Sequence, residues 1–139
     1  MTYQVLGDTI ALRLQIGEEI ITSITAVCEK EHITAGTISG LGAADHAVVG
    51  LYRVGEKKYF PTELDRDMEI TSLIGNISQM DGKVYLHIHA TFADDTGRVF
   101  GGHLNEATIS ATAEIFLRRL DGTIGRRHDA SIGLNLMDV

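Results

Sequence analysis

The sequence predicts an α+β fold, in which a mostly antiparallel β-sheet carries one main α-helix packed on its core-facing side. Three observations predict this class. Several runs alternate apolar and polar residues, one segment has apolar residues at helical spacing, and turn signals with aspartate and glycine separate the strand-like runs. The chain has 139 residues and no repeat, low-complexity tract or linker, so we expect a single domain over residues 1–139.

The N-terminal part is expected to contain a strand followed by the helix. Apolar and polar residues alternate from 10 to 16, as is typical of a half-buried strand. From Glu18 onward the spacing is helical, so we predict a helix over about 18–34, with acidic residues in its first turn and a stop at Gly36. Cys28 falls on the apolar face of that helix, which favours a role in the core. It is the only cysteine, so the chain cannot form an intrachain disulfide.

The next stretch is rich in glycine. Residues 36–54 read as two strands joined by "GLGAAD" (40–45). A phosphate-binding loop would normally open a helix, whereas the residues that follow are strand-like, so these glycines are expected to serve turns and close packing. Residues 55–69 are polar, are expected to be irregular, and hold the only proline, Pro61.

A first hairpin is predicted around the Asp81-Gly82 pair. The runs "EITSLIGNIS" and "KVYLHIHATF" flank this pair, and Asp-Gly between two strand-like runs is a strong signal for a two-residue turn. With the pair as the loop, Asn76 faces His87 and Ile74 faces His89.

A second hairpin is predicted to turn at "DDTGR" (94–98), where Gly97 suits the left-handed position that ends a three-residue loop. In this register His89 lies opposite His103. His87 shares a face with His89 because side chains alternate along a strand, and directly opposed residues also share a face, with Cβ atoms about 5 Å apart. The three imidazoles should therefore converge, whereas a slip of one residue would turn His103 to the other face.

Three converging neutral imidazoles suit Zn²⁺ or a similar divalent ion, with a fourth position left for water or another ligand. We therefore predict a metal site formed by His87, His89 and His103, with zinc as the expected ion and weaker affinity in acid. Asn76 on the flanking strand is expected to orient an imidazole. The alternative is that the three histidines are unrelated polar residues on an open face of the sheet. No ligand role is expected for His32, His46 or His128.

The chain is expected to end with another pair of strands. Alternation over 108–117 predicts a strand, and "LDGT" (120–123) predicts a turn. Alternation over 131–137 predicts a last strand, which is a candidate partner of the first strand.

Charge and hydropathy limit the classes of partner. The formal charge is −7 and the sequence pI is about 5.2, so a phosphate backbone would repel the chain unless its basic residues gather on one face. No stretch approaches the roughly 18 apolar residues that span a bilayer, and the N-terminus lacks the pattern of a signal peptide. We therefore expect a cytoplasmic protein. The one dense basic group is expected to be a solvated hairpin end; it comprises Arg118, Arg119, Arg126 and Arg127.

Several segments resemble the plant-and-prokaryote-conserved (PPC) domain: "ISGLGA" (38–43), "EITSLIGNIS" (69–78), "LHIHATFADDTGRVFGGHL" (86–104) and "TAEIFL" (112–117). The similarity covers nearly the whole chain and is most specific over 86–104. It implies an α+β domain that assembles as a homotrimer and, in stand-alone prokaryotic members, a metal site of histidines matching the three named above. Plant members contact DNA through a separate Arg-Gly-Arg-Pro-type arm, which has no counterpart here.

Three functions therefore stand as hypotheses. The first is a metal-binding homotrimeric module whose surface binds a protein or small-molecule partner. The second is a metalloenzyme, since a zinc ion with an open position can activate water; its general base would be sought among Glu106, Glu114 and Asp94. The third is a DNA-binding protein, against which the charge argues. A cupin-like barrel is the competing fold, but the predicted helix and the absence of a glutamate at the cupin spacing count against it.

Overall fold

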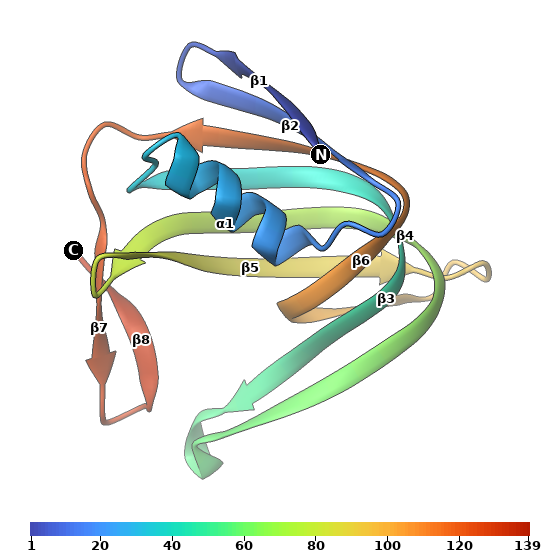
Figure 1. Cartoon of the computed structure of the whole chain (residues 1–139). Helices are drawn as coiled ribbons and strands as arrows, with labels where there is room; N and C mark the ends of the chain where they lie inside the picture. The colour runs from blue at the N-terminus through green and yellow to red at the C-terminus, as the bar shows by residue number, and fades with distance from the viewer.

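The computed structural model describes residues 1–139 as one mainly antiparallel sheet with a helix packed on it (Figure 1). This arrangement confirms the predicted α+β class. The strand order is β1-β2-β6-β3-β4-β7-β8, and β5 pairs with both β4 and β6, so that β3, β4, β5 and β6 close a cycle of pairings. The elements are β1 (Thr2–Leu6), β2 (Thr9–Gln15), α1 (Ile20–Lys30), β3 (Gly36–Arg53), the 3-10 turn η1 (Val54–Glu56), β4 (Lys58–Met80), β5 (Lys83–Ala93), β6 (Val99–Arg119), β7 (Gly125–Asp129) and β8 (Leu134–Asp138).

One continuous core lies between α1 and the sheet. Of the alternating apolar positions in the predicted first strand, Ile10, Leu12 and Leu14 are buried in β2, whereas Ile16 lies beyond the end of β2 and is 73% exposed. The apolar face of α1 packs on this core, with Cys28 among its buried residues. Phe92 of β5 is the largest fully buried side chain. Burying a side chain of this kind contributes about 1.5–3 kcal/mol, so this core is a large source of stability for the fold. None of the helices has the length and apolar character needed to cross a membrane.

The helix is shorter than predicted at both ends. Glu19 is the N-cap, and its carboxylate accepts hydrogen bonds from the backbone N–H groups of Ile21 (2.9 Å) and Thr22 (2.7 Å). The helix ends at Lys30, because His32 adopts a left-handed φ of 53°. Gly36, the predicted stop, instead opens β3. The left-handed position carries histidine where glycine is the usual residue, so the sequence did not reveal the true end.

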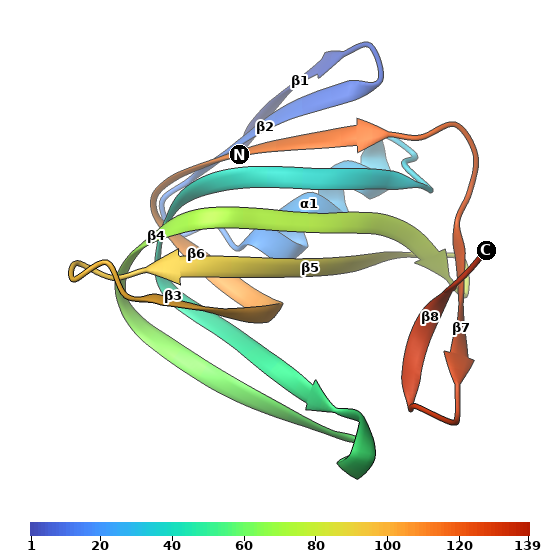
Figure 2. The same cartoon turned by 180° about the vertical axis from the view of Figure 1, so that it is seen from behind.

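The segment predicted as two strands is one long strand, β3, and the segment 55–69 predicted as irregular belongs mostly to β4. Irregularities in pairing between Gly40 and Gly42, and again near Ala44, bend β3 at the place that resembled a loop. Pro61 is tolerated inside β4 because β5 pairs with β4 only from Glu69 onward, so the proline faces an unpaired edge. The outer parts of β3 and β4 thereby form a long hairpin, the arm (residues 50–62), which projects from the sheet in Figure 2.

Two pairings at the ends of the chain also differ from the prediction. The unpredicted strand β1 pairs with β2 and forms the sheet edge. The last strand, β8, pairs with β7 and not with the first predicted strand. The β7–β8 hairpin touches the sheet through one parallel pair, Gln79 with Gly125, and it descends beside the end of β4 (Figure 1).

Candidate metal centre and the adjoining cavity

The first hairpin has the predicted register. Asp81 and Gly82 both have left-handed φ values, 52° and 74°, as a type I′ turn requires. Met80 therefore pairs with Lys83, and counting back along the ladder brings Asn76 opposite His87 and Ile74 opposite His89.

The second hairpin also has the predicted register. Gly97 has a φ of 75°, its N–H donates to the carbonyl of Asp94 (2.9 Å), and the N–H of Asp94 donates to the carbonyl of Arg98 (3.0 Å). The pairing that follows brings His89 opposite His103. Two local turn signals are therefore enough to align histidines that lie on separate strands.

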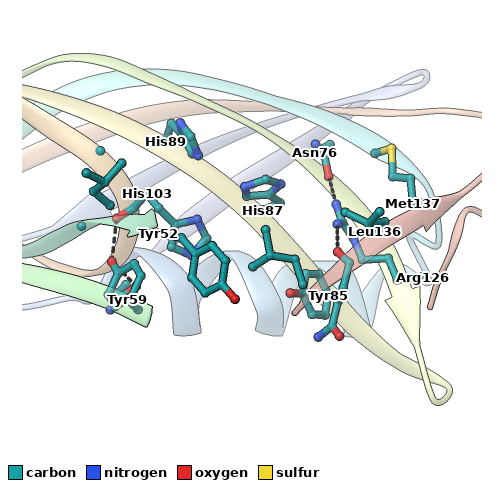
Figure 3. Close-up of a pocket in the computed structure, with 16 residues that line it drawn as sticks. Tyr52, Tyr59, Asn76, Tyr85, His87, His89, His103, Arg126, Leu136 and Met137 are labelled. Carbon is teal, nitrogen blue, oxygen red and sulfur yellow. Dashed lines mark hydrogen bonds between the residues drawn. The ribbon is translucent and has the colours of Figure 1, made fainter. Parts of the chain in front are cut away.

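The three imidazoles converge on the face of the sheet opposite α1, as Figure 3 shows. Their ring centroids are separated by 5.1 Å (His87 to His89), 5.2 Å (His87 to His103) and 5.7 Å (His89 to His103). One ring nitrogen from each histidine lies within 4.8 Å of the other two. Tetrahedral zinc with Zn–N bonds near 2.05 Å separates its ligand nitrogens by about 3.3 Å, so small side-chain rotations would bring these atoms into ligating positions.

The electrostatics of the cluster favour neutral rings. Burial is the main cause that lowers the pKa of His87 to about 4, and the nearby His103, His89 and Arg126 lower it further. Burial also lowers the pKa of His103, followed by the effect of His89. At pH 7 both rings are therefore neutral, the form in which imidazole binds a metal ion. The donor set and its protonation state fit a divalent cation.

A cavity of about 760 Å³ adjoins the histidines. Its floor is the histidine-bearing part of β5 and β6, one wall is the arm, and the other wall is the β7–β8 hairpin (Figure 3). The arm and the hairpin touch at their tips, where the hydroxyl of Tyr52 donates to the carbonyl of Ile132 (2.8 Å) and the ammonium of Lys57 donates to the carbonyl of Ala130 (2.8 Å). The space is therefore enclosed by three parts of the chain that are distant in sequence.

Tyr59 supports one of the histidines from the arm. Its ring lies edge-on to His103 with 6.1 Å between centroids, and its hydroxyl donates to the amide oxygen of Asn105 (3.0 Å). Burial raises the pKa of Tyr59, so the hydroxyl stays protonated. The Tyr59 ring thereby limits the space that is open to the His103 ring.

Arg126 is a cavity residue that the sequence did not reveal. Its guanidinium donates to the hydroxyl of Ser78 (2.7 Å), the carbonyl of Asn135 (2.8 Å) and the amide oxygen of Asn76 (2.8 Å), and it stacks 4.6 Å from the centroid of Tyr85. The oxygen of Asn76 thus accepts from this arginine, and no hydrogen bond joins the Asn76 side chain to an imidazole. Arg126 was expected to belong to a solvated basic hairpin end together with Arg118, Arg119 and Arg127, so its place in the cavity could not be seen from the sequence.

The predicted basic group does not form one solvated hairpin end. Arg118 pairs with Asp8 and Arg127 pairs with Asp138 at the surface. Arg119, by contrast, is partly buried and donates to the carbonyl of Glu31 (2.9 Å). The arginines point to separate places, so they do not build a continuous basic face.

The acidic residues considered as general bases lie away from the cavity. Glu106 pairs with His46, Asp94 accepts hydrogen bonds within its own turn, and Glu114 is exposed on β6. None of the cavity-lining residues is an aspartate or a glutamate. The site therefore contains metal-ligating groups without an adjacent carboxylate base.

A second group of candidate ligands is formed by His46, Glu63 and Asp65. Both ring nitrogens of His46 are already engaged, Nδ1 with Asp65 (2.5 Å) and Nε2 with Glu106 (3.0 Å). These partners, the Asp65 bond first, raise the pKa of His46 to about 9. His46 is thus a cation between two carboxylates.

Comparison with known proteins decides the family. Residues 1–121 match the Plants and Prokaryotes Conserved (PCC) domain, also called PPC. The chain belongs to this family. No curated protein matches it closely enough to add a function. The match includes His87, His89 and His103, whereas Arg126 and the β7–β8 hairpin lie beyond it.

Solved structures of similar proteins cover 99% of this PPC chain. A PPC protein from Pyrococcus horikoshii is 37% identical, with a TM-score of 0.89 over 95% of its length. A metal-containing protein from Archaeoglobus fulgidus is 36% identical, with a TM-score of 0.89 over 98% of its length. A "putative DNA binding protein" from Bacteroides thetaiotaomicron is 29% identical, with a TM-score of 0.96 over 96% of its length.

Proposed function

We propose that this PPC protein binds one divalent metal ion per chain, with zinc as the expected ion, and works as a homotrimeric binding module for a protein or small-molecule partner. The observation that carries the proposal is the convergence of His87, His89 and His103 beside a cavity. The similar Archaeoglobus protein is metal-containing, which supports the same reading. A three-histidine zinc ion keeps a fourth position for an exchangeable ligand, so a partner could bind directly to the metal.

Metal analysis tests the proposed site. Purified protein is stripped with a chelator, loaded with ZnSO₄, and analysed for metal content and for zinc affinity by competitive titration. We expect one zinc per chain, and we expect His89→Ala to weaken binding by more than the 10- to 100-fold that loss of an outer-shell partner typically costs. His128→Ala, which removes an exposed imidazole from β7, is the matched control. Equal zinc binding by both variants would reject the site.

Trimerisation is supported by apolar side chains on the face that carries the histidines. Ile74 is 64% exposed and lies opposite His89, and Phe116 is 51% exposed and lies opposite Ser39, which itself faces Ile74. Neighbouring strands therefore carry a row of apolar residues next to the proposed metal. A monomer would leave this row and its sheet edges in water, whereas copies of the same chain could cover both.

Native mass spectrometry and light scattering test the assembly. We expect a trimer for the wild-type chain and for Val54→Lys, an equally drastic change at an exposed residue of η1. We expect Phe116→Lys to produce monomers, because a charge would enter the proposed interface. A wild-type monomer at micromolar concentration would refute the homotrimer.

DNA binding is a second candidate because similar proteins from Bacteroides and Ralstonia are named as putative DNA-binding proteins. The charge of −7 and the scattered arginines argue against it in this chain. A gel shift with random duplex DNA at low salt is decisive. Salt-sensitive retention would favour this function over the binding module.

A metalloenzyme is the third candidate, favoured by the cavity next to the proposed metal. It lacks a carboxylate base among the lining residues. Turnover of ester or phosphoester substrates that stops with chelator and returns with zinc would establish it.

A further inference from the structure

The cavity has an unbalanced charge. Arg126 is the only lining residue with a permanent charge, because no aspartate, glutamate or lysine contributes to the walls. All three hydrogen-bond partners of its guanidinium are neutral oxygens, those of Ser78, Asn135 and Asn76. A partly buried cation without an anion nearby is energetically costly. An anionic ligand in the cavity would therefore supply the counter-ion that Arg126 lacks.

The guanidinium retains donors for such a partner. Arginine has five N–H groups, of which three are engaged, one on each nitrogen. Each terminal nitrogen of Arg126 therefore keeps one free N–H. Two such donors on one guanidinium are enough to bind the two oxygens of a carboxylate. The stacking on Tyr85 and the three existing bonds hold the fork in a fixed orientation, which lowers the entropy cost of binding.

The remaining walls suit an apolar body. Leu51 and Tyr52 contribute from the arm, and Leu134, Leu136 and Met137 contribute from the β7–β8 hairpin. The volume of about 760 Å³ lies within the range of small-molecule sites. A ligand with one charged end and an apolar end would satisfy both the arginine and these side chains.

A carboxylate fits better than a phosphate. Phosphate sites usually combine several cations with a helix N-terminus or a nest of backbone N–H groups. Here one arginine stands among tyrosine and asparagine side chains, and α1 lies on the other face of the sheet. One planar guanidinium with two free N–H groups matches the two oxygens of a carboxylate and leaves the further oxygens of a phosphate without donors.

We propose that the cavity binds a small organic monocarboxylate, whose charged group is recognised by Arg126 and whose apolar body lies against the arm and the β7–β8 hairpin. The inference rests on the proposed metal site, since a dication held by three neutral histidines would add to the positive charge facing the ligand. It adds the chemical class of the ligand and the residue that selects it. Figure 3 shows His87 between the other two histidines and Arg126. The proposed metal ligands and Arg126 therefore border the same cavity.

Calorimetric titration of the full chain tests the proposal. The probes are unbranched, branched and aromatic monocarboxylic acids of three to ten carbons, each compared with its primary amide and with phenyl phosphate. We expect at least one acid to bind ten or more times tighter than its amide. If no acid exceeds its amide, or if phenyl phosphate binds tighter than every acid, the carboxylate assignment is overturned.

Variants of the chain test whether Arg126 causes the preference for acids over amides. Arg126→Gln should abolish the acid-over-amide ratio, and Arg126→Lys should retain part of it because the charge remains. Arg127→Gln is the matched control: it is the next residue of β7 and pairs with Asp138 at the surface. A full acid preference in Arg126→Gln would overturn the proposal. If this variant fails to fold, the ratios of the wild-type and Arg126→Lys chains decide.

Metal content, measured in the same samples, separates the two proposals. One zinc per chain without acid preference would refute the carboxylate site and leave the metal site standing. Absence of zinc would refute the metal site, and the acid-over-amide ratio of the metal-free chain, with its dependence on Arg126, would then decide the inference alone.

Discussion

Replacement of Gly102 by alanine tests whether the packing of β6 against β3 positions His103. A Cβ at this position would lie 2.6 Å from the carbonyl oxygen of Gly50 and 3.2 Å from its amide nitrogen. Close carbon–oxygen contacts in sheets are about 3.4 Å, so the two strands would have to separate by roughly 0.8 Å. Metal–ligand distances tolerate about 0.2 Å, and the displacement falls on the residue next to a proposed ligand.

We therefore expect Gly102→Ala to lower zinc affinity by at least about 10-fold, the lower end of the loss seen when ligand orientation is disturbed. The free energy of unfolding should fall by about 1–3 kcal/mol, as for other overpacked positions. Competitive zinc titration and urea unfolding measure the two quantities. Gly55→Ala is the control, because no atom lies within 4 Å of its added Cβ and its φ is not left-handed. A folded Gly102→Ala chain with wild-type zinc affinity would refute the reasoning.

Two further predictions concern titratable groups. The ion pairs of His46 with Asp65 and Glu106 raise its pKa to about 9. The wild-type chain should therefore have a higher free energy of unfolding than His46→Gln, with the full difference below about pH 6.5 and none once the pH has risen through 9. The partners of His46 are mostly exposed, so the difference in urea unfolding free energy should be only about 0.2–1 kcal/mol per pair, and a difference that grows with pH would contradict the assignment. Burial raises the pKa of Cys28 to about 12, so a thiol reagent at pH 8 should label it only after denaturation; rapid labelling of the native chain would contradict its core placement.

The register of the two hairpins could be predicted because it is set by short-range signals. Asp81-Gly82 and Gly97 each require a left-handed backbone that few residues adopt, and a turn of known length fixes every pair that follows. The convergence of three histidines on one face is therefore a local property, although the third comes from another strand. The buried alternation of β2 could be predicted for the same reason, since it depends only on period.

The full length of strands β3 and β4 could not be predicted, because pairing with neighbouring strands extends both through segments that resemble loops. The glycines near Gly42 resembled a turn, but they allow close approach to β6: a Cβ there would lie 2.4 Å from the carbonyl oxygen of Thr112. Polar residues in the arm resembled a loop because that part of β4 has one free edge and little core to face. Local propensity was overridden in both places by the partner strand.

The cavity was hidden for a different reason. Its second wall, the β7–β8 hairpin, is fixed by Arg126 and by contacts between tips far apart in sequence, and no turn signal encodes them. The histidines lie inside the segment that matches the PPC family, whereas Arg126 lies outside it. The proposed metal ligands thus come from β5 and β6 of the sheet, whereas the residue proposed to select the ligand comes from the β7–β8 hairpin. PPC proteins that keep the three histidines but alter this hairpin would then hold the same metal while binding different molecules, which is how one scaffold can serve several ligands.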